Sequence, residues 1–260
     1  GPLGHAGLRR ILADRESQRE GVEVDPDHLA LTNGSMQAVT LVGRALMKAP
    51  GDVIVTEELT YPGTIAAYKG IGARLVGVPV DNQGMRTDLL AATLEDLRRT
   101  GDEARFIYTL PTYQNPTAAV MPLERREELL DVANRFEIQV VEDNCYADVH
   151  FDGEVPPSLY TLKGGENVIY LCSLSKIFAA GLRIGYLYAR PPMLEHLTSR
   201  RFDAGHSVLA ASVAAAYLDD GELWRHVEEH NAALRKKRDA LLESLDQHLE
   251  GICTWLAPIG

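Results

Sequence analysis

An apolar run in the second half of the chain leads straight into two serines and a lysine: Val168-Ile169-Tyr170-Leu171-Cys172-Ser173-Leu174-Ser175-Lys176. Its first four residues are β-branched, aromatic or leucine, which favours a buried strand. An arginine follows shortly afterwards in Gly181-Leu182-Arg183-Ile184-Gly185. The stretch therefore predicts a buried strand whose carboxyl end carries an amine, with two serines and an arginine that could hold an anion.

Similar apolar runs recur upstream and alternate with helical stretches. The predicted strands are residues 29–32, 53–56, 74–80, 105–109, 138–141 and 168–171. Predicted helices open after residue 34, run over 63–70 and run over 122–136, where apolar residues share one face. Apolar strands separated by helices predict an α/β fold with a mostly parallel central sheet.

The pattern changes after Arg190-Pro191-Pro192. Residues 193–250 contain no convincing strand and carry two or three helical stretches. We therefore expect one large domain over residues 1–190. Residues 191–260 are expected to hold crossover helices and the beginning of a smaller C-terminal domain.

Composition excludes several classes of protein. The 26 basic and 37 acidic side chains give a net charge of −11, which disfavours nucleic acid and anionic membranes as partners. No run approaches the roughly 18 apolar residues of a membrane span, and no signal peptide is visible. Three cysteines without a Cys-x-x-Cys pair indicate a reducing compartment. The expectation is a soluble, cytoplasmic protein.

Ligands of open α/β sheets bind at the carboxyl ends of the strands, so the residues at those positions carry information. After residues 29–32 comes Gly34-Ser35-Met36, at the start of a helix. Free N–H groups there suit a phosphate, although an ordinary serine cap explains the same residues. After residues 53–56 comes Tyr61, which could stack on a flat ligand or simply pack in its Pro-Gly turn.

The next strand ends supply an amide, a carboxylate and an amine. Asn115 could donate to a ligand oxygen or only form an Asn-Pro turn. Glu142 and Asp143 follow a buried strand, where a carboxylate is costly without a cationic partner. Lys176 is a candidate Schiff-base amine because partial burial would lower its pKa, although most lysines are solvated surface charges. Taken together, these groups describe a site for pyridoxal 5′-phosphate.

At this point the sequence resembles the fold-type I pyridoxal-phosphate enzymes of the class I/II aminotransferase family. It is most similar to the branch of 2-aminoadipate and kynurenine aminotransferases, which also supplies the effector domain of MocR-type regulators. The resemblance rests on Ser173, Ser175, Lys176 and Arg183, and on their order after Asn115-Pro116-Thr117 and Glu142-Asp143-x-x-Tyr146. It implies a three-layer sandwich, a homodimer with the site at its interface, and part of an N-terminal arm in residues 1–20.

The resemblance also implies a role for each site residue. Lys176 would form the aldimine with the cofactor and then move the proton of the substrate's Cα. Asp143 would pair with the pyridinium nitrogen and keep it protonated. Tyr146 and Asn115 would hold the ring's O3′, and Tyr61 would stack on its face. The phosphate would be bound by the remaining residues: Gly34, Ser35, Met36, Ser173, Ser175 and Arg183. Lys176, Asp143 and Tyr146 are thus the predicted catalytic residues.

The expected activity is transfer of an amino group from an amino acid to a 2-oxo acid. Oxidase, decarboxylase or lyase chemistry on the same cofactor remains an alternative, as does a MocR-type effector domain that binds the cofactor without turnover. Family members are longer, and the arginine that holds the substrate's α-carboxylate normally lies beyond residue 260. We therefore expect the chain to be part of a longer protein.

One motif points to a different chemistry. His226-Val227-Glu228-Glu229-His230 matches the H-x-x-E-H pattern of zinc proteases. No clear third ligand accompanies it, and an acidic helical face explains the same residues. The prediction is that the chain has no metal site.

Overall fold

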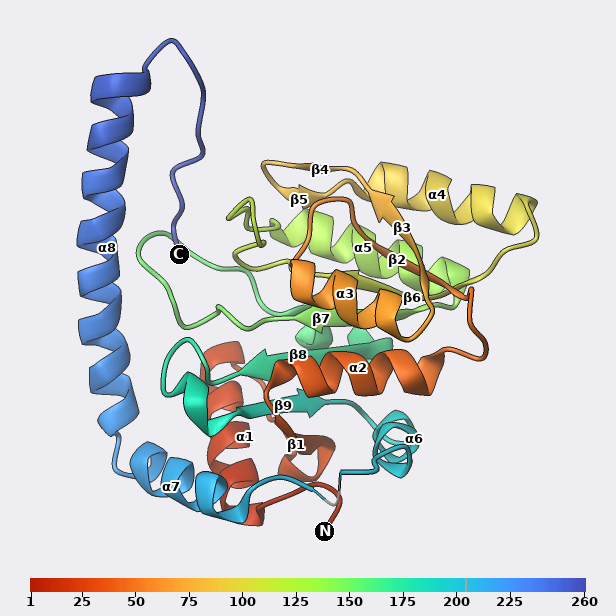
Figure 1. Cartoon of the computed structure of the whole chain (residues 1–260), viewed down its shortest axis with the longest axis horizontal. Coiled ribbons are helices and arrows are strands. Elements are labelled where there is room, and N and C mark those ends of the chain that lie inside the picture. The colour runs from red at the N-terminus through yellow and green to blue at the C-terminus, as the bar shows by residue number, and fades with distance from the viewer. Residues whose placement is uncertain (204) are drawn as a thin grey trace.

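A computed structural model describes residues 1–203 and 205–260. Within them a seven-stranded sheet has the order β1-β9-β8-β7-β6-β2-β3 (Figure 1). Its strands are β1 (Leu29–Asn33), β2 (Val53–Glu57), β3 (Arg74–Val78), β6 (Ala104–Thr109), β7 (Gln139–Asp143), β8 (Val168–Ser173) and β9 (Ile184–Tyr188). β9 runs antiparallel to both of its neighbours, and the other pairings are parallel. The predicted mostly parallel sheet is confirmed.

Helices cover both faces of the sheet. Those described are α1 (Ala6–Glu20), α2 (Ser35–Leu46), α3 (Pro62–Gly70), α4 (Thr87–Arg99), α5 (Leu123–Phe136), α6 (Met193–Ser199), α7 (Val208–Asp219) and α8 (Glu222–Leu249). Successive strand residues point to opposite faces. Ile54 therefore packs in a core beneath α2, α3 and α6, whereas Val55 packs in a second core beneath α1, α4 and α5. The three-layer α/β sandwich is confirmed.

Three features differ from the predicted elements. The strand predicted over residues 74–80 is wrong beyond Val78. Pro79 lacks an N–H group for the sheet, and β4 (Val80–Asp81) turns away to pair with β5 (Gly84–Met85). In addition, β9 and α4 lie outside the specifically predicted segments, and residues 6–20 of the expected arm form α1.

The predicted helical region after residue 190 is confirmed in its described part, where α6 packs on α2 and α7 on α1. Of α8, Leu223 and Val227 are buried, and the helix then runs alongside the sheet (Figure 1). There Asn231 Nδ2 donates to Asp148 O at 2.7 Å, and Arg238 pairs with Asp152 at 2.6 Å. The chain returns so that Phe151 N donates to Ile259 O at 2.8 Å. The domain boundary at residue 190 stays a prediction.

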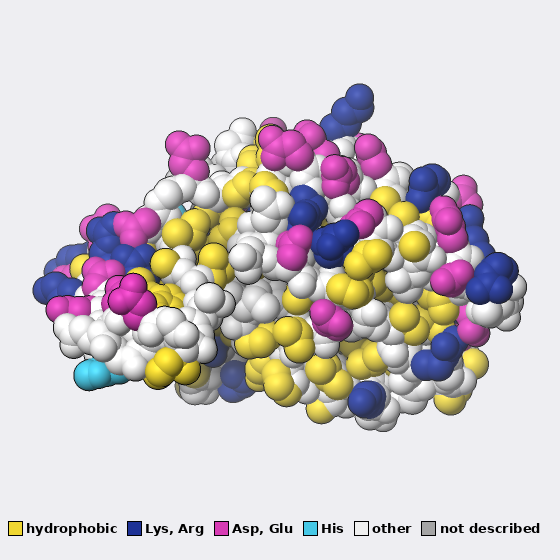
Figure 2. Space-filling model, turned by 90° about the horizontal axis from the view of Figure 1, so that it is seen from above, with side chains coloured by type: hydrophobic (Ala, Val, Ile, Leu, Met, Phe, Trp, Pro, Cys, Tyr) yellow, Lys and Arg dark blue, Asp and Glu magenta, His cyan; other side chains and the backbone are white. Residues whose placement is uncertain are grey.

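The outer surface carries both signs of charge. In the view from above, acidic and basic side chains are intermixed around apolar groups (Figure 2). Among the described residues, no helix is both long and apolar enough to cross a membrane.

Candidate active site

The carboxyl ends of the parallel strands gather the predicted residues around one cavity of about 200 Å³. Strand register explains the convergence, because Gly185 of β9 lies opposite both Thr32 of β1 and Ser173 of β8. The cavity is lined by the predicted residues Ser35, Met36, Tyr61, Asp143, Tyr146, Ser173, Ser175, Lys176 and Arg183, and also by Leu110, Cys145 and Ala180. The predicted residues Gly34 and Asn115 are outside this lining, but each contacts a lining residue, Gly34 contacting Arg183 and Asn115 contacting Tyr146.

An anion cradle forms where β1, β8 and β9 meet. Gly34 has a φ of 78° and is the residue just before α2, and a Cβ atom there would overlap Nη2 of Arg183. A Cβ atom at Gly185 would lie 2.6 Å from Ser35 N, so glycine at this position lets β9 approach the start of α2. A cationic guanidinium, serine hydroxyls and a helix N-terminus therefore face the same volume, which suits a phosphate.

Asp143 is the buried acid of the site. The residue is 6% exposed, and Oδ2 accepts from the Tyr108 hydroxyl at 2.6 Å while Oδ1 accepts from Cys145 Sγ at 2.8 Å. Burial raises the pKa of this carboxyl group, and the two hydrogen bonds oppose that shift. Among the described side chains no cation forms an ion pair with it. A cationic ligand in the cavity would form an ion pair with this carboxylate.

Glu142, the other candidate acid, is directed to the opposite face of β7. It accepts from Leu159 N at 3.1 Å, and Oε1 lies 4.0 Å from Nη1 of the buried Arg126. Because strand side chains alternate between faces, only Asp143 reaches the cavity. The structure therefore separates two residues that the sequence left as alternatives.

Lys176 and Tyr146 lie together on another side of the cavity, and Asn115 is hydrogen-bonded to Tyr146. The Nζ atom of Lys176 is 5.7 Å from the centre of the Tyr146 ring, and Asn115 Nδ2 donates to the Tyr146 hydroxyl at 3.1 Å. Lys176 itself is exposed, so the expected partial burial of this amine is wrong. The reason is local, because the residue lies in the turn after β8 and borders the open cavity.

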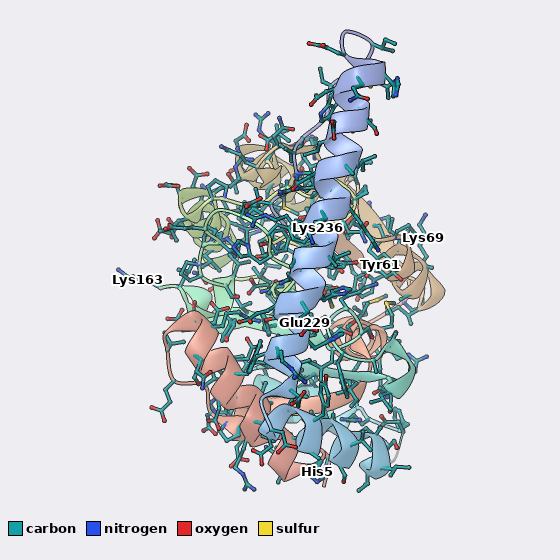
Figure 3. The ribbon with its side chains drawn as sticks, turned by 90° about the vertical axis from the view of Figure 1, so that its left-hand side faces the viewer. His5, Tyr61, Lys69, Lys163, Glu229 and Lys236 are labelled. Carbon is teal, nitrogen blue, oxygen red and sulfur yellow. The ribbon has the colours of Figure 1, made fainter. Side chains whose placement is uncertain are left out.

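Tyr61 lies at the start of α3, and Lys69 marks the other end of that helix (Figure 3). Its side chain lines the cavity and is 40% exposed. The ring also covers Gly63, because a Cβ atom there would overlap ring carbons. The residue thus packs in its turn and faces the cavity at once, and its stacking on a ligand stays a prediction.

Further residues of the site lie outside the predicted set. Glu57 ends β2, is buried, and accepts from Thr109 Oγ1 at 2.8 Å and from Gln114 Nε2 at 3.0 Å. It thereby fixes the loop that carries Asn115, and burial raises its pKa to about 7. Glu57 also stands at the end of an apolar strand, so the pattern that predicts Asp143 predicts Glu57 as well. Cys145 could have been found from its place inside the Asp143-x-x-Tyr146 loop.

The zinc-protease motif lies on α8, where Figure 3 places Glu229. The rings of His226 and His230 stack with their centroids 5.8 Å apart. Among the described residues, no group of three or more histidine, cysteine, aspartate or glutamate side chains is placed to hold a metal ion.

Comparison with known proteins agrees with this geometry. The chain is 32% identical to aromatic-amino-acid aminotransferase 1 of Thermococcus litoralis, over 99% of this chain and 62% of that protein. It is 30% identical to an uncharacterized helix-turn-helix transcriptional regulator of Bacillus subtilis, YisV, over 100% of this chain and 52% of that one. The chain therefore spans between half and two thirds of the length of these relatives.

A solved structure is equally similar. The kynurenine aminotransferase of Pyrococcus horikoshii, solved with PMP, with KYN as substrate and with KYA as product, superposes with a TM-score of 0.93 and 31% identity, over 100% of this chain and 64% of that one. The fold places the chain among α/β proteins that have a mostly parallel central sheet with helices on both faces. Residues 1–257 match the model of the aminotransferase class I and II family, and the chain belongs to that family.

Proposed function

We propose that the protein binds pyridoxal 5′-phosphate and transfers the amino group of an amino acid to a 2-oxo acid. The observation that carries this proposal is the buried Asp143 carboxylate, which faces the same cavity as Lys176 and the anion cradle of Ser35, Ser173 and Arg183. A phosphorylated pyridine aldehyde has one group for each of these: a phosphate for the cradle, a ring nitrogen for Asp143 and an aldehyde for Lys176. The residues present fit the cofactor.

Each residue then has a distinct task. When bound, the cofactor supplies an electron sink for the bond broken at the substrate's Cα. Asp143 holds a proton on the ring nitrogen, and Tyr146 with Asn115 binds the ring oxygen. The Nζ atom of Lys176 takes and returns the Cα proton. Gly34, Met36 and Ser175 complete the phosphate site, and Tyr61 covers the ring.

The wider assembly is part of the proposal. We expect two copies to form a homodimer with the site at their interface, in the cytoplasm, where the three cysteines stay reduced. Amino acids and 2-oxo acids are the expected substrates. Oxidation, decarboxylation or elimination on the same cofactor is the alternative chemistry, because the cofactor-binding residues are common to all of them.

The test is the absorption spectrum of the purified protein with pyridoxal 5′-phosphate, for the wild type and for Lys176→Ala. We expect a visible band of lysine-bound cofactor that the variant lacks. Amino acids should convert the band to that of pyridoxamine phosphate, and a 2-oxo acid should restore it. Absence of any band after the addition of cofactor would overturn the proposal. Lys163→Ala is the control, because Lys163 lies outside the cavity.

A second candidate is a cofactor-binding effector domain of a MocR-type regulator, favoured by the match to YisV over 100% of this chain. It predicts a band that depends on Lys176 and that no amino acid converts to the pyridoxamine form. The same titration therefore distinguishes the two functions.

A further inference from the structure

The wall of the cavity contains a thiol beside the buried acid. Cys145 Sγ lies 2.8 Å from Oδ1 of Asp143, and the residue lines the same cavity. On the other side, the Tyr108 hydroxyl lies 2.6 Å from Oδ2 and 3.0 Å from Thr64 Oγ1. Each oxygen of the carboxylate therefore has its own partner, one from the loop after β7 and one from β6.

Both partners act as donors. Burial and the nearby Asp143 charge raise the pKa of the Cys145 thiol well above its usual range, so it keeps its proton at neutral pH. Burial likewise raises the pKa of the Tyr108 hydroxyl. Donors on both oxygens favour the charged form of Asp143 and fix the plane of its carboxylate.

We propose that Cys145 is a positioning residue that holds Asp143 charged and aimed at the ring nitrogen of the cofactor. This inference rests on the proposed function, because it needs pyridoxal 5′-phosphate as the ligand. It goes beyond that function by assigning a role to a thiol that has no part in the chemistry. Cys145 acts through Asp143, so its contribution exists only when the ligand carries a ring nitrogen.

The experiment compares two ligands. One is pyridoxal 5′-phosphate, and the other is its carbocyclic analogue, in which a C–H group replaces the ring nitrogen. Dissociation constants are measured by absorbance for the wild type, Cys145→Ala, Cys145→Val and Cys145→Ser. Loss of the thiol donor in the alanine and valine variants should weaken binding of the natural cofactor about five- to tenfold. Serine keeps a donor and should stay within about twofold of the wild type.

Binding of the analogue separates positioning from packing. We expect all four proteins to bind it with the same affinity, because it gives Asp143 no partner. Equal losses for both ligands would mean that Cys145 only fills space, and unchanged affinity of Cys145→Ala for the natural cofactor would mean that it does nothing. Either result overturns the inference. A wild type that binds neither ligand would instead overturn the proposed function.

Two further variants serve as a parallel test and as a control. Tyr108→Phe removes the other donor to Asp143 and should show the same selective loss for the natural cofactor. Cys253→Ala removes an exposed cysteine outside the cavity and should bind both ligands like the wild type. Thermal unfolding of each cofactor-free variant checks that the variant is folded. If only Tyr108→Phe binds the natural cofactor more weakly, and the Cys145 variants do not, the role of Cys145 is overturned.

Discussion

At the scale of single residues, chemistry depends on which face of a strand a side chain occupies. Asp143 and Glu142 are adjacent in β7, yet Asp143 borders the cavity and Glu142 is held by backbone N–H groups near Arg126. Glu57, also buried, accepts one hydrogen bond from the last residue of β6 and two from the loop before Asn115. Three acids at strand ends thus have three different tasks, and only one of them is placed to meet a cationic ligand.

Tyr61 gives the first prediction at this scale. Tyr61→Ala should weaken the binding of pyridoxal 5′-phosphate about tenfold, or about 1.4 kcal/mol, through loss of ring stacking. Tyr61→Phe keeps the ring and should bind like the wild type. The measurement is the dissociation constant from absorbance titration. Leu59→Ala is the matched control, since Leu59 is an exposed residue of the same loop and lies outside the cavity lining. Unchanged affinity of Tyr61→Ala would remove the stacking role.

Most of the predicted site could be placed from the sequence because it lies at the ends of strands, and strand ends are visible as breaks in an apolar run. Lys176 and Asp143 were selected in this way, and both line the cavity. The role of Tyr108 cannot be predicted from the sequence, because Tyr108 lies inside β6 and reaches Asp143 only because β6 pairs with β7. The exposure of Lys176 cannot be predicted either, since the apolar run before it says nothing about the turn after it.

At the scale of elements, the antiparallel strand β9 organises the site. It lies between β1 and β8, and it carries Arg183 on the turn that precedes it. Short apolar stretches with a glycine give a weak strand signal, which is why β9 escaped prediction. Its Gly185 faces the backbone of Gly34, Ser35 and Cys172. The close approach of three chain segments therefore depends on the absence of one side chain.

Gly185→Ala should destabilise the fold by about 2 kcal/mol, because the new methyl group meets backbone atoms that cannot rotate away. It should also weaken phosphate binding by moving β9 from the start of α2. Urea unfolding and the inhibition of cofactor binding by inorganic phosphate measure the two effects. Gly70→Ala is the control, since nothing lies within 4 Å of its added Cβ atom. Equal stability of the two variants would contradict the close approach.

At the scale of the whole molecule, two buried acids link stability to pH. Burial raises the pKa values of Glu57 and Glu142 to about 7, from 4.5 in an exposed glutamate. Between these pH values the folded chain retains protons that the unfolded chain has lost. The free energy of unfolding should therefore fall as pH rises from about 5 to about 7.5.

Glu57→Gln tests this dependence, because it removes the titrating carboxyl group of Glu57 and keeps a side chain of the same shape. The loss of stability between pH 5 and pH 7.5 should be smaller in the variant by about 2 kcal/mol. Urea unfolding at both pH values provides the measurement. Glu58→Gln, at an exposed neighbouring position, should behave like the wild type. An unchanged difference in Glu57→Gln would show that Glu57 titrates normally.

The pairing of β1 with β9 also sets an order of events during synthesis on the ribosome. Gly34 and Ser35 are synthesised well before Ser173, Arg183 and Gly185. Until then β1 lacks its partner strand β9, in which Tyr188 pairs with Leu29. Contacts between such distant segments form late, and unpaired apolar strands are exposed to aggregation in the meantime. Gly34 and Ser35, which follow β1, thus cannot complete a phosphate site until β9 has emerged from the ribosome.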